Sequence, residues 1–133
     1  PGGRKSRLGS YYIHLDPEGS FLAGGVYMPQ TGDLSLIRQE IDYNLEEFEA
    51  ILNKTSFKKY FSGLDDNGRL KTAPKGYEPD NLAIEHLKNK SFTVSCMLKR
   101  EDVESADFVK KSLEIFKELY PLNRFLSRAL DKS

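Results

Sequence analysis

The sequence predicts an α+β fold: an antiparallel, hairpin-based sheet packed against three or more helices. Three observations predict this class. Two strand-like segments are joined by a tight turn, several apolar stripes have helical spacing, and strands and helices do not alternate regularly along the chain. With 133 residues the chain has the size of one domain with one core, so we expect residues 1–133 to form a single domain.

A β-hairpin is the clearest local feature. Side chains in residues 10–16 alternate with the period of two that a strand requires, and residues 21–28 form the return strand. Between them, Asp16-Pro17-Glu18-Gly19 has the residue preferences of a type I turn. The two segments are therefore expected to pair as antiparallel strands.

The turn determines the expected register of this hairpin. If Asp16 pairs with Gly19, His14 faces Phe21 and each strand divides its side chains between two faces. A bulge at Gly19 would instead swap the faces of one strand. The residues expected on the core face are Tyr11, Ile13, Leu15, Leu22, Val26 and Met28. Those expected on the opposite face are Tyr12, His14, Phe21, Ala23 and Tyr27.

Apolar residues spaced three and four apart predict the first helices. A stripe that runs from Leu34 to Leu52 predicts one continuous helix over residues 33–53. A short helical turn is expected at residues 57–61, and a short extended piece at residues 69–72. The middle of the chain is therefore mostly helix and loop.

The C-terminal part is expected to contain a strand between helices. Residues 80–88 have a helical pattern, and residues 92–98 alternate in the manner of a strand. A longer helix begins after Ser105. Pro121 is expected to interrupt it, because proline removes a backbone donor, so residues 122–130 would form a separate last helix.

Composition narrows the classes of function and location. The chain has 20 basic and 20 acidic side chains, and this balance disfavours a general binder of duplex DNA. Cys96 is the only cysteine, which suits a reducing compartment. No apolar run approaches the ~18 residues of a membrane span and no signal sequence is visible, so we expect a cytoplasmic protein with no membrane partner. Because the chain starts at Pro1, we also expect a processed or excised piece.

Two basic segments carry the leading functional hypothesis. If they meet in the fold, they form a pocket for phosphate, carboxylate or single-stranded nucleic acid, with backbone N–H groups from nearby glycines and Tyr77 as a stacking surface. The protein would then be a binding module for an anionic small molecule or a nucleic-acid end. The alternative is that these are solvated loop charges. The residues are Arg4, Lys5, Arg7, Arg69, Lys71, Lys75 and Tyr77.

His14 carries an alternative hypothesis, an enzyme of hydrolase or transferase type. His14 and Asp16 share a strand face, so a carboxylate could orient the imidazole as a general base. No nucleophile lies at an informative spacing, and a half-exposed sheet histidine explains the residue equally well. Whether the protein is an enzyme therefore stays open at this point.

The other chemical groups favour structural roles. The Gly24-Gly25 pair in a strand indicates a close approach, either by a ligand or by packing, and packing is the favoured reading. Cys96 lies on the apolar side of its strand and is expected to be a buried thiol. His14 and His86 are far apart in sequence and offer no ligand spacing, so neither a metal nor a cofactor is expected.

Several segments, in order over nearly the whole chain, match the pattern of a known family. They are Gly3-Arg4-Lys5-Ser6, Tyr11-Tyr12-Ile13-His14, Gly19-Ser20-Phe21-Leu22-Ala23-Gly24-Gly25, Met28-Pro29, Ile37-Arg38-Gln39-Glu40-Ile41, Phe57-Lys58-Lys59-Tyr60-Phe61, Leu70-Lys71-Thr72-Ala73-Pro74-Lys75-Gly76-Tyr77 and Lys90-Ser91-Phe92. Through these segments the chain resembles the uncharacterised family called domain of unknown function 2461. The chain departs from the family pattern at Tyr27, where a Trp is expected, and at Asn81-Leu82, where His-Pro is expected.

The resemblance implies a fold unit but no activity. It implies that the chain corresponds to the C-terminal two-thirds of a longer unit whose N-terminal region is missing here. A third hypothesis follows, a structural or interaction protein in which that missing part leaves an apolar face or an open strand edge. Such a surface would allow the chain to form a homo-oligomer.

Overall fold

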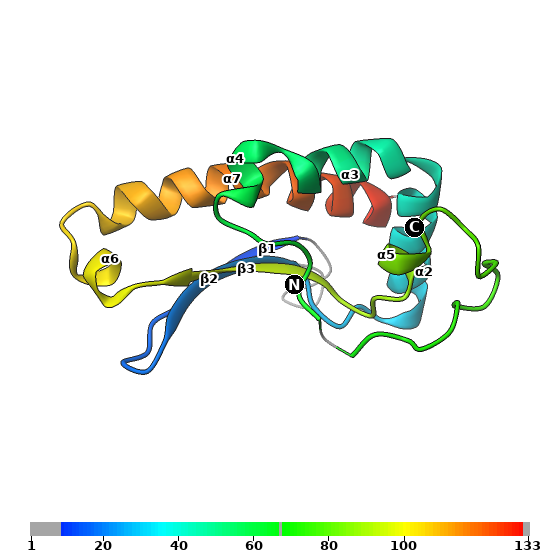
Figure 1. Ribbon diagram of the computed structural model, residues 1–133, viewed down its shortest axis with the longest axis horizontal. Coiled ribbons are helices and arrows are strands. Elements are labelled where there is room, and N and C mark those ends of the chain that lie inside the picture. Colours follow the sequence, from blue (N-terminus) through cyan, green and yellow to red (C-terminus); the bar gives the residue numbers. More distant parts are fainter. Residues whose placement is uncertain (1–8, 67, 132–133) are drawn as a thin grey trace.

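The computed structural model describes residues 9–66 and 68–131. Within them, a three-stranded antiparallel sheet with strand order β1-β2-β3 lies beneath a layer of helices (Figure 1). The elements are β1 (Ser10–His14), β2 (Ser20–Val26), α2 (Thr31–Tyr43), α3 (Leu45–Asn53), α4 (Thr55–Lys58), α5 (Ile84–Leu87), β3 (Phe92–Leu98), α6 (Arg100–Glu104) and α7 (Phe108–Leu130). The predicted α+β class is confirmed.

The hairpin has the predicted register. The Gly19 backbone N–H donates to the Asp16 carbonyl oxygen at 3.0 Å, and His14 pairs with Phe21. The expected division of faces holds for β2, where Leu22 and Val26 are buried under the helices. On β1, however, Tyr11 and Ile13 face the helix layer and are still 45% and 44% exposed. The predicted face is right, but the expectation that this part of it would be buried is wrong, because β1 is the edge of the sheet and α7 covers it only in part.

The prediction is also wrong for the ends of the two hairpin strands. β1 ends at His14 and β2 ends at Val26, so Leu15 and Met28 lie outside the strands. Both side chains are exposed rather than buried. Met28 has a positive φ of 46°, which takes the chain out of the extended conformation that a strand requires.

The predicted helix over residues 33–53 is two helices. α2 and α3 are separated at Asn44, whose φ and ψ of −124° and 45° are not helical. The Asn44 side-chain amide donates to the Glu40 carboxylate at 3.0 Å and stabilises the bend. The break lets α3 change direction and run along α7, where Phe48 packs against Phe125 with ring centroids 5.1 Å apart.

The C-terminal helix is continuous where an interruption was expected. α7 runs for 23 residues with Pro121 inside it. Pro121 has no N–H group to donate to the carbonyl of Lys117 in the preceding turn. Lys117 is exposed, so water can donate to this carbonyl instead. The apolar residues on both sides of Pro121 bury one continuous face. This burial keeps the two halves in line.

Shorter elements also differ from the prediction. The expected helix at residues 80–88 contains only the four residues of α5, and the turn expected at 57–61 is α4, which begins and ends earlier. No strand forms at residues 69–72, and α6 was not predicted. These segments have too few apolar residues for a period to define their limits.

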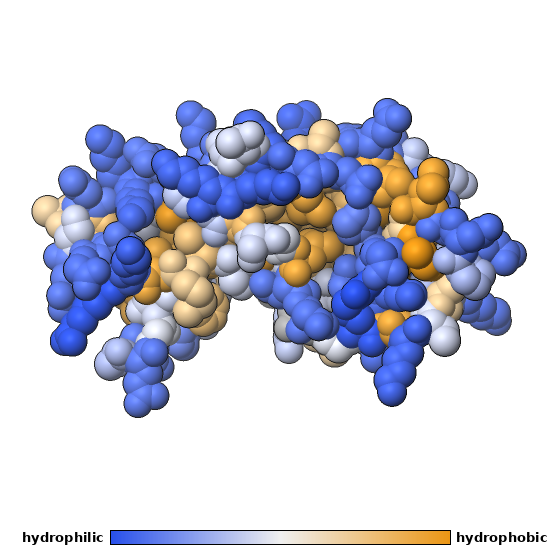
Figure 2. Space-filling view, viewed as in Figure 1, coloured by the Kyte–Doolittle hydropathy of each residue, from blue (hydrophilic) through white to orange (hydrophobic). Residues whose placement is uncertain are grey.

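The core lies between the helices and one face of the sheet. Figure 2 shows hydrophilic residues over the outer surface of the helices and apolar residues in the band between helices and sheet. The largest fully buried side chains are Phe48, Phe57, Phe61, Phe92, Phe125, Leu22, Ile37, Ile41, Leu87, Ile115, Leu119 and Leu122. No described helix packs on the other face of the sheet (Figure 1).

Close packing explains the Gly24-Gly25 pair. A Cβ on Gly24 would overlap the side chain of Leu119 from α7 and the Ser10 carbonyl oxygen. A Cβ on Gly25 would overlap the Phe92 carbonyl oxygen of β3, and its φ of 111° disfavours other residues. The two glycines therefore let β1, β3 and α7 approach β2 closely.

None of the helices in the described ranges has the length and apolar character needed to cross a membrane.

Candidate functional site

A pocket between α2 and the loop before α5 gathers positive charge. It has a volume of about 430 Å³. α2 contributes Arg38 and Asp42, and the loop contributes Lys75 and Tyr77. The remaining lining residues are Ser35, Gln39, Tyr43 and Gly76.

Arg38 is the most constrained charge in this pocket. One terminal nitrogen donates to the Asn89 carbonyl oxygen at 3.1 Å, while the Nε atom is buried and has no hydrogen-bond partner. Burial lowers the pKa of the guanidinium, and the nearby Tyr77 partly opposes this shift. No carboxylate of the described residues forms an ion pair with it. Arg38 is thus a partly desolvated cation with an unused donor.

A tight turn positions Lys75 and Tyr77 opposite Arg38. The Tyr77 N–H donates to the Pro74 carbonyl at 3.1 Å, and Gly76 has a φ of 95°. This is the pattern of a type II turn, in which the third residue needs a positive φ and is usually glycine. Lys75 is exposed at the corner of the turn, and Tyr77 packs on the core.

The one acidic residue of this pocket is held in place by a hydrogen bond. Asp42 accepts from the Asn81 side-chain amide at 2.9 Å. Burial, followed by the charge of Asp42, raises the pKa of Tyr77, so its hydroxyl stays protonated and can donate. The pocket therefore offers a guanidinium, an ammonium and a phenol as donors, against one carboxylate. This set suits an anionic group.

The structure brings together only some of the predicted basic residues. Lys75 and Tyr77 line one pocket, whereas Arg69 lines another and donates to the Glu85 carboxylate at 2.9 Å. Lys71 is exposed on the intervening chain. The other three, Arg4, Lys5 and Arg7, lie outside the described residues.

The chain matches a known family over most of its length. The model of the family described as conserved hypothetical protein (DUF2461) matches residues 1–125. The chain belongs to the DUF2461 family. This confirms the resemblance found in the sequence. No curated protein and no solved structure matches the chain.

Sequence reasoning did not select Arg38 in this DUF2461 chain. Arg38 lies in a helix on the polar side of an apolar stripe, where a charged residue is normally solvated. Its position in the segment Ile37-Arg38-Gln39-Glu40-Ile41, which carries part of the family resemblance, is the one available signal. Its contact with Asn89 depends on the tertiary fold and has no local signature.

His14 lies on the sheet face that the helices do not cover. Its Nδ1 atom is 3.4 Å from the Tyr12 hydroxyl, and its Nε2 atom is 3.7 Å from the Asp16 carboxylate. The imidazole stacks on Phe21 with ring centroids 4.9 Å apart. Both ring nitrogens thus face a neighbouring side chain of the described structure.

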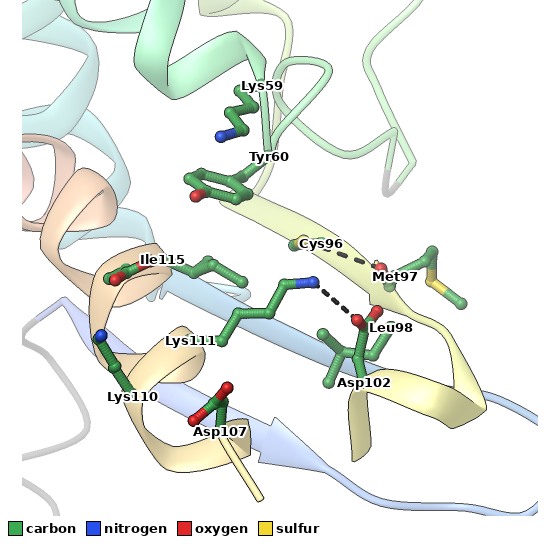
Figure 3. Close-up of a pocket in the computed structure, with 11 residues that line it drawn as sticks. Lys59, Tyr60, Cys96, Met97, Leu98, Asp102, Asp107, Lys110, Lys111 and Ile115 are labelled. Carbon is green, nitrogen blue, oxygen red and sulfur yellow. Dashed lines mark hydrogen bonds and ion pairs between the residues drawn. The ribbon is translucent and has the colours of Figure 1, made fainter. Parts of the chain in front are cut away.

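A second pocket of the DUF2461 chain surrounds Cys96 (Figure 3). Its volume is about 510 Å³, and it lies where the end of β3 meets α6 and α7. Lys111 reaches into it and binds Asp102 at 2.7 Å, which lowers the pKa of Asp102 and raises that of Lys111. The predicted buried position of Cys96 is confirmed, and burial raises the pKa of its thiol. Lys111, which reaches into this pocket, already has its carboxylate, and the thiol is protonated.

Cys96 is therefore expected to react slowly with thiol reagents. At pH 8 the rate of modification by a disulfide reagent should be at least about tenfold lower for the native protein than for the unfolded chain, because the thiolate is the reactive form. The colour released by the reagent, with and without denaturant, measures both rates. Equal rates would show that Cys96 is accessible and ionised in the native state.

Metal ligands do not cluster in the described structure. Across residues 9–66 and 68–131, no group of three or more His, Cys, Asp or Glu side chains lies close enough to hold a metal ion.

Proposed function

We propose that this protein is a binding module for a small anionic molecule, which it holds through a carboxylate or phosphate group in the pocket of Arg38, Lys75 and Tyr77. The observation that carries the proposal is the buried Nε atom of Arg38, which has no hydrogen-bond partner. Of the residues expected from the sequence, Lys75 and Tyr77 belong to this pocket, and Arg38 is its central residue.

The physical argument starts from the cost of an unpaired buried donor. Leaving a buried donor on a charged group without a partner costs about 1–3 kcal/mol or more. Arg38 lines the pocket, so an oxyanion there would compensate the desolvated charge, since arginine binds carboxylate and phosphate through its planar array of N–H groups. The Nε atom itself has almost no accessible surface, so the anion would accept from it only after a small turn of the Arg38 side chain.

Lys75 and Tyr77 extend the same binding surface. Lys75 is on the outer side of the pocket and can supply a second positive charge, while the protonated Tyr77 hydroxyl can donate a hydrogen bond. Asp42 leaves the pocket with a small net positive charge. This balance favours a mono- or dianion over a long polyanion, so a nucleic-acid end is the alternative ligand and not the first choice.

Titration with simple anions tests the proposal. Inorganic phosphate and citrate are added to the parent chain and to the Arg38→Gln variant, and backbone amide shifts around residues 75–77 are followed by NMR. We expect the parent to bind at least one anion, and the variant to bind it about tenfold or more weakly, because a charge-assisted hydrogen bond is lost.

A matched control separates this effect from a general loss of charge. Arg100→Gln removes an exposed arginine of α6 and should leave affinity unchanged. Lys75→Ala should weaken binding, whereas Lys71→Ala should not. If Arg38→Gln keeps its fold and full affinity for each anion, the pocket is not the binding site. Tighter binding of a 5′-phosphorylated oligonucleotide than of phosphate would favour the nucleic-acid end.

The enzyme hypothesis with His14 as general base stays a prediction. A general base needs a ring nitrogen that faces its substrate. Since Tyr12 and Asp16 occupy the two sides of the ring, the binding function has the stronger physical support.

A further inference from the structure

In the described part of the chain, the outer edge of β1 lacks the features that normally protect an edge strand. Among the described residues no strand pairs with this edge. Natural edge strands carry lysine, proline, a bulge or a covering segment that blocks pairing with another chain. Residues 10–15 contain no lysine, arginine or proline, and the pairing with β2 is continuous without a bulge. Within residues 9–66 and 68–131, β1 is therefore open to a further strand.

α7 carries an exposed apolar stripe. Val109, Leu113, Phe116 and Tyr120 are spaced by four, three and four residues, which places them within about 60° of the helix circumference. Val109 and Leu113 are 68% and 63% exposed, and Tyr120 is also exposed. Such a stripe normally packs on another element.

This stripe lies on the side of α7 that faces the open edge. Phe116 touches Tyr11 of β1, with ring centroids 5.3 Å apart, and the Asn123 amide donates to the Ser10 carbonyl at 2.9 Å. The opposite side of α7 packs against α3 and α4, for example through the hydrogen bond from Ser56 to Glu118. The strand edge and the stripe thus form one continuous surface that has no partner among the described residues.

We propose that a second copy of this chain covers this surface, with β1 pairing antiparallel to β1 of the copy. The two sheets would become one six-stranded sheet, and both α7 helices would lie on the same face of it. A twofold axis perpendicular to the sheet relates the copies, so each residue contact occurs twice. The inference does not depend on the anion pocket.

The spacing of strands and helices fits this arrangement. α7 lies over the space between β1 and β2, since Leu119 touches Gly24 and Phe116 touches Tyr11. Neighbouring β strands are ~4.8 Å apart, and the twofold axis lies midway between the two paired β1 strands. The helix α7 therefore lies about one strand spacing from the twofold axis, and the two α7 helices are ~10 Å apart. Packed helices are typically 8–10 Å apart.

The order of residues in the stripe is also self-complementary. In an antiparallel copy, spacings of four, three and four pair Val109 with Tyr120 and Leu113 with Phe116. The middle of the stripe lies between Leu113 and Phe116, only ~2 Å along the helix from Phe116. Phe116 contacts Tyr11, and α7 and β1 run in opposite directions, so this midpoint is displaced from Tyr11 toward Tyr12. One axis near Tyr12 therefore serves both the strand pair and the helix pair.

The exposed apolar area is close to what a dimer needs. Seven of the twelve exposed large hydrophobic residues of the described chain lie on or beside this surface, namely Tyr11, Tyr12, Ile13, Leu15, Val109, Leu113 and Tyr120. Each of these side chains exposes on the order of 100 Å², about half of what a buried aromatic side chain covers. Together they approach the ~800 Å² that each partner buries in a standard interface.

Measurement of mass in solution tests the inference. Light scattering on the 133-residue chain at concentrations up to ~100 μM should give the mass of a dimer, since interfaces of this size have dissociation constants of micromolar or below. Leu113→Glu should weaken the dimer at least tenfold and give a folded monomer, because the side chain is already exposed in the single chain. Leu82→Glu, at a position that is 92% exposed elsewhere, should remain dimeric.

Cross-linking tests the register. The axis near Tyr12 brings the two Tyr12 Cα atoms to ~4.5–5.5 Å, within the range for a disulfide. Tyr12→Cys should give a covalent dimer on oxidation, and Tyr27→Cys should not. A parent chain that is monomeric at ~100 μM, a dimer that Leu113→Glu leaves intact, or a dimer in which Tyr12→Cys fails to cross-link would each overturn the inference.

Discussion

Replacement of Gly25 by alanine is expected to reduce the free energy of unfolding by about 4 kcal/mol. The new Cβ would overlap the Phe92 carbonyl oxygen, and this backbone atom cannot rotate away as a side chain could. Overpacking of this kind costs about 1–3 kcal/mol. The φ of 111° adds about 1–3 kcal/mol of strain for any residue other than glycine. Denaturant unfolding of the variant and the parent measures this loss, which is a large part of a typical net stability of about 5–15 kcal/mol.

Gly32→Ala is the matched control for this substitution. Gly32 lies in the first turn of α2, has a negative φ, and has no heavy atom within 4 Å of its ideal Cβ position. Alanine there should be neutral or stabilising by about 0.5–1 kcal/mol. A Gly25→Ala protein as stable as Gly32→Ala would mean that β2 and β3 are farther apart than the structure places them.

Loss of the Arg128 side chain is expected to destabilise the protein by about 3 kcal/mol. Arg128 donates to the Glu40 carboxylate at 3.0 Å and to Glu47 at 2.7 Å, and so joins α7 to α2 and α3. Glu40 is only 2% exposed. Removal of one partner from a buried ion pair typically costs about 3–5 kcal/mol, because the other charge remains buried. The exposure of Arg128 itself places this case at the lower end.

Arg100→Ala provides the comparison for Arg128→Ala. Arg100 and Glu104 form an ion pair within α6 at 3.4 Å, and both side chains are exposed. Such a pair contributes at most about 0.5 kcal/mol. The loss of unfolding free energy, measured by thermal and denaturant unfolding, should therefore be several-fold larger for Arg128→Ala than for Arg100→Ala. Equal small effects would show that Glu40 has enough other partners to remain buried without the guanidinium.

Local chemistry was sufficient to predict the hairpin and the position of β3. The turn preferences of Asp16-Pro17-Glu18-Gly19 determine the hairpin register, and a period of two identifies β3. Both signals involve residues close together in sequence. The pairing of β2 with β3, which are separated by about half of the chain, follows from tertiary packing and not from any local pattern.

The helix limits could not be predicted because two of them depend on distant partners. The apolar stripe continues through Asn44, so no period shows the break between α2 and α3. Pro121 indicates a break that burial along α7 overrides. Intrinsic preference is weak compared with packing over several turns.

The candidate site was predictable only at Lys75 and Tyr77, where glycine and proline identify a loop. Arg38 comes from a helix with a solvent-facing pattern and becomes significant only through burial against Asn89. Arg69 has the composition expected of a ligand-binding residue but is paired with Glu85. Sequence can suggest which residue types suit an anion. It does not show which of them remain unpaired after folding.

The position of Leu119 over Gly24 has a consequence for the order of folding. The first hairpin completes its core only against the last helix, almost a hundred residues later, and β2 also waits for β3. Contacts between such remote segments slow the folding reaction, since a long loop must close before they form. During synthesis on the ribosome the hairpin would therefore emerge early and stay unsupported until α7 has been made, which makes this interval the period in which a chaperone is most useful.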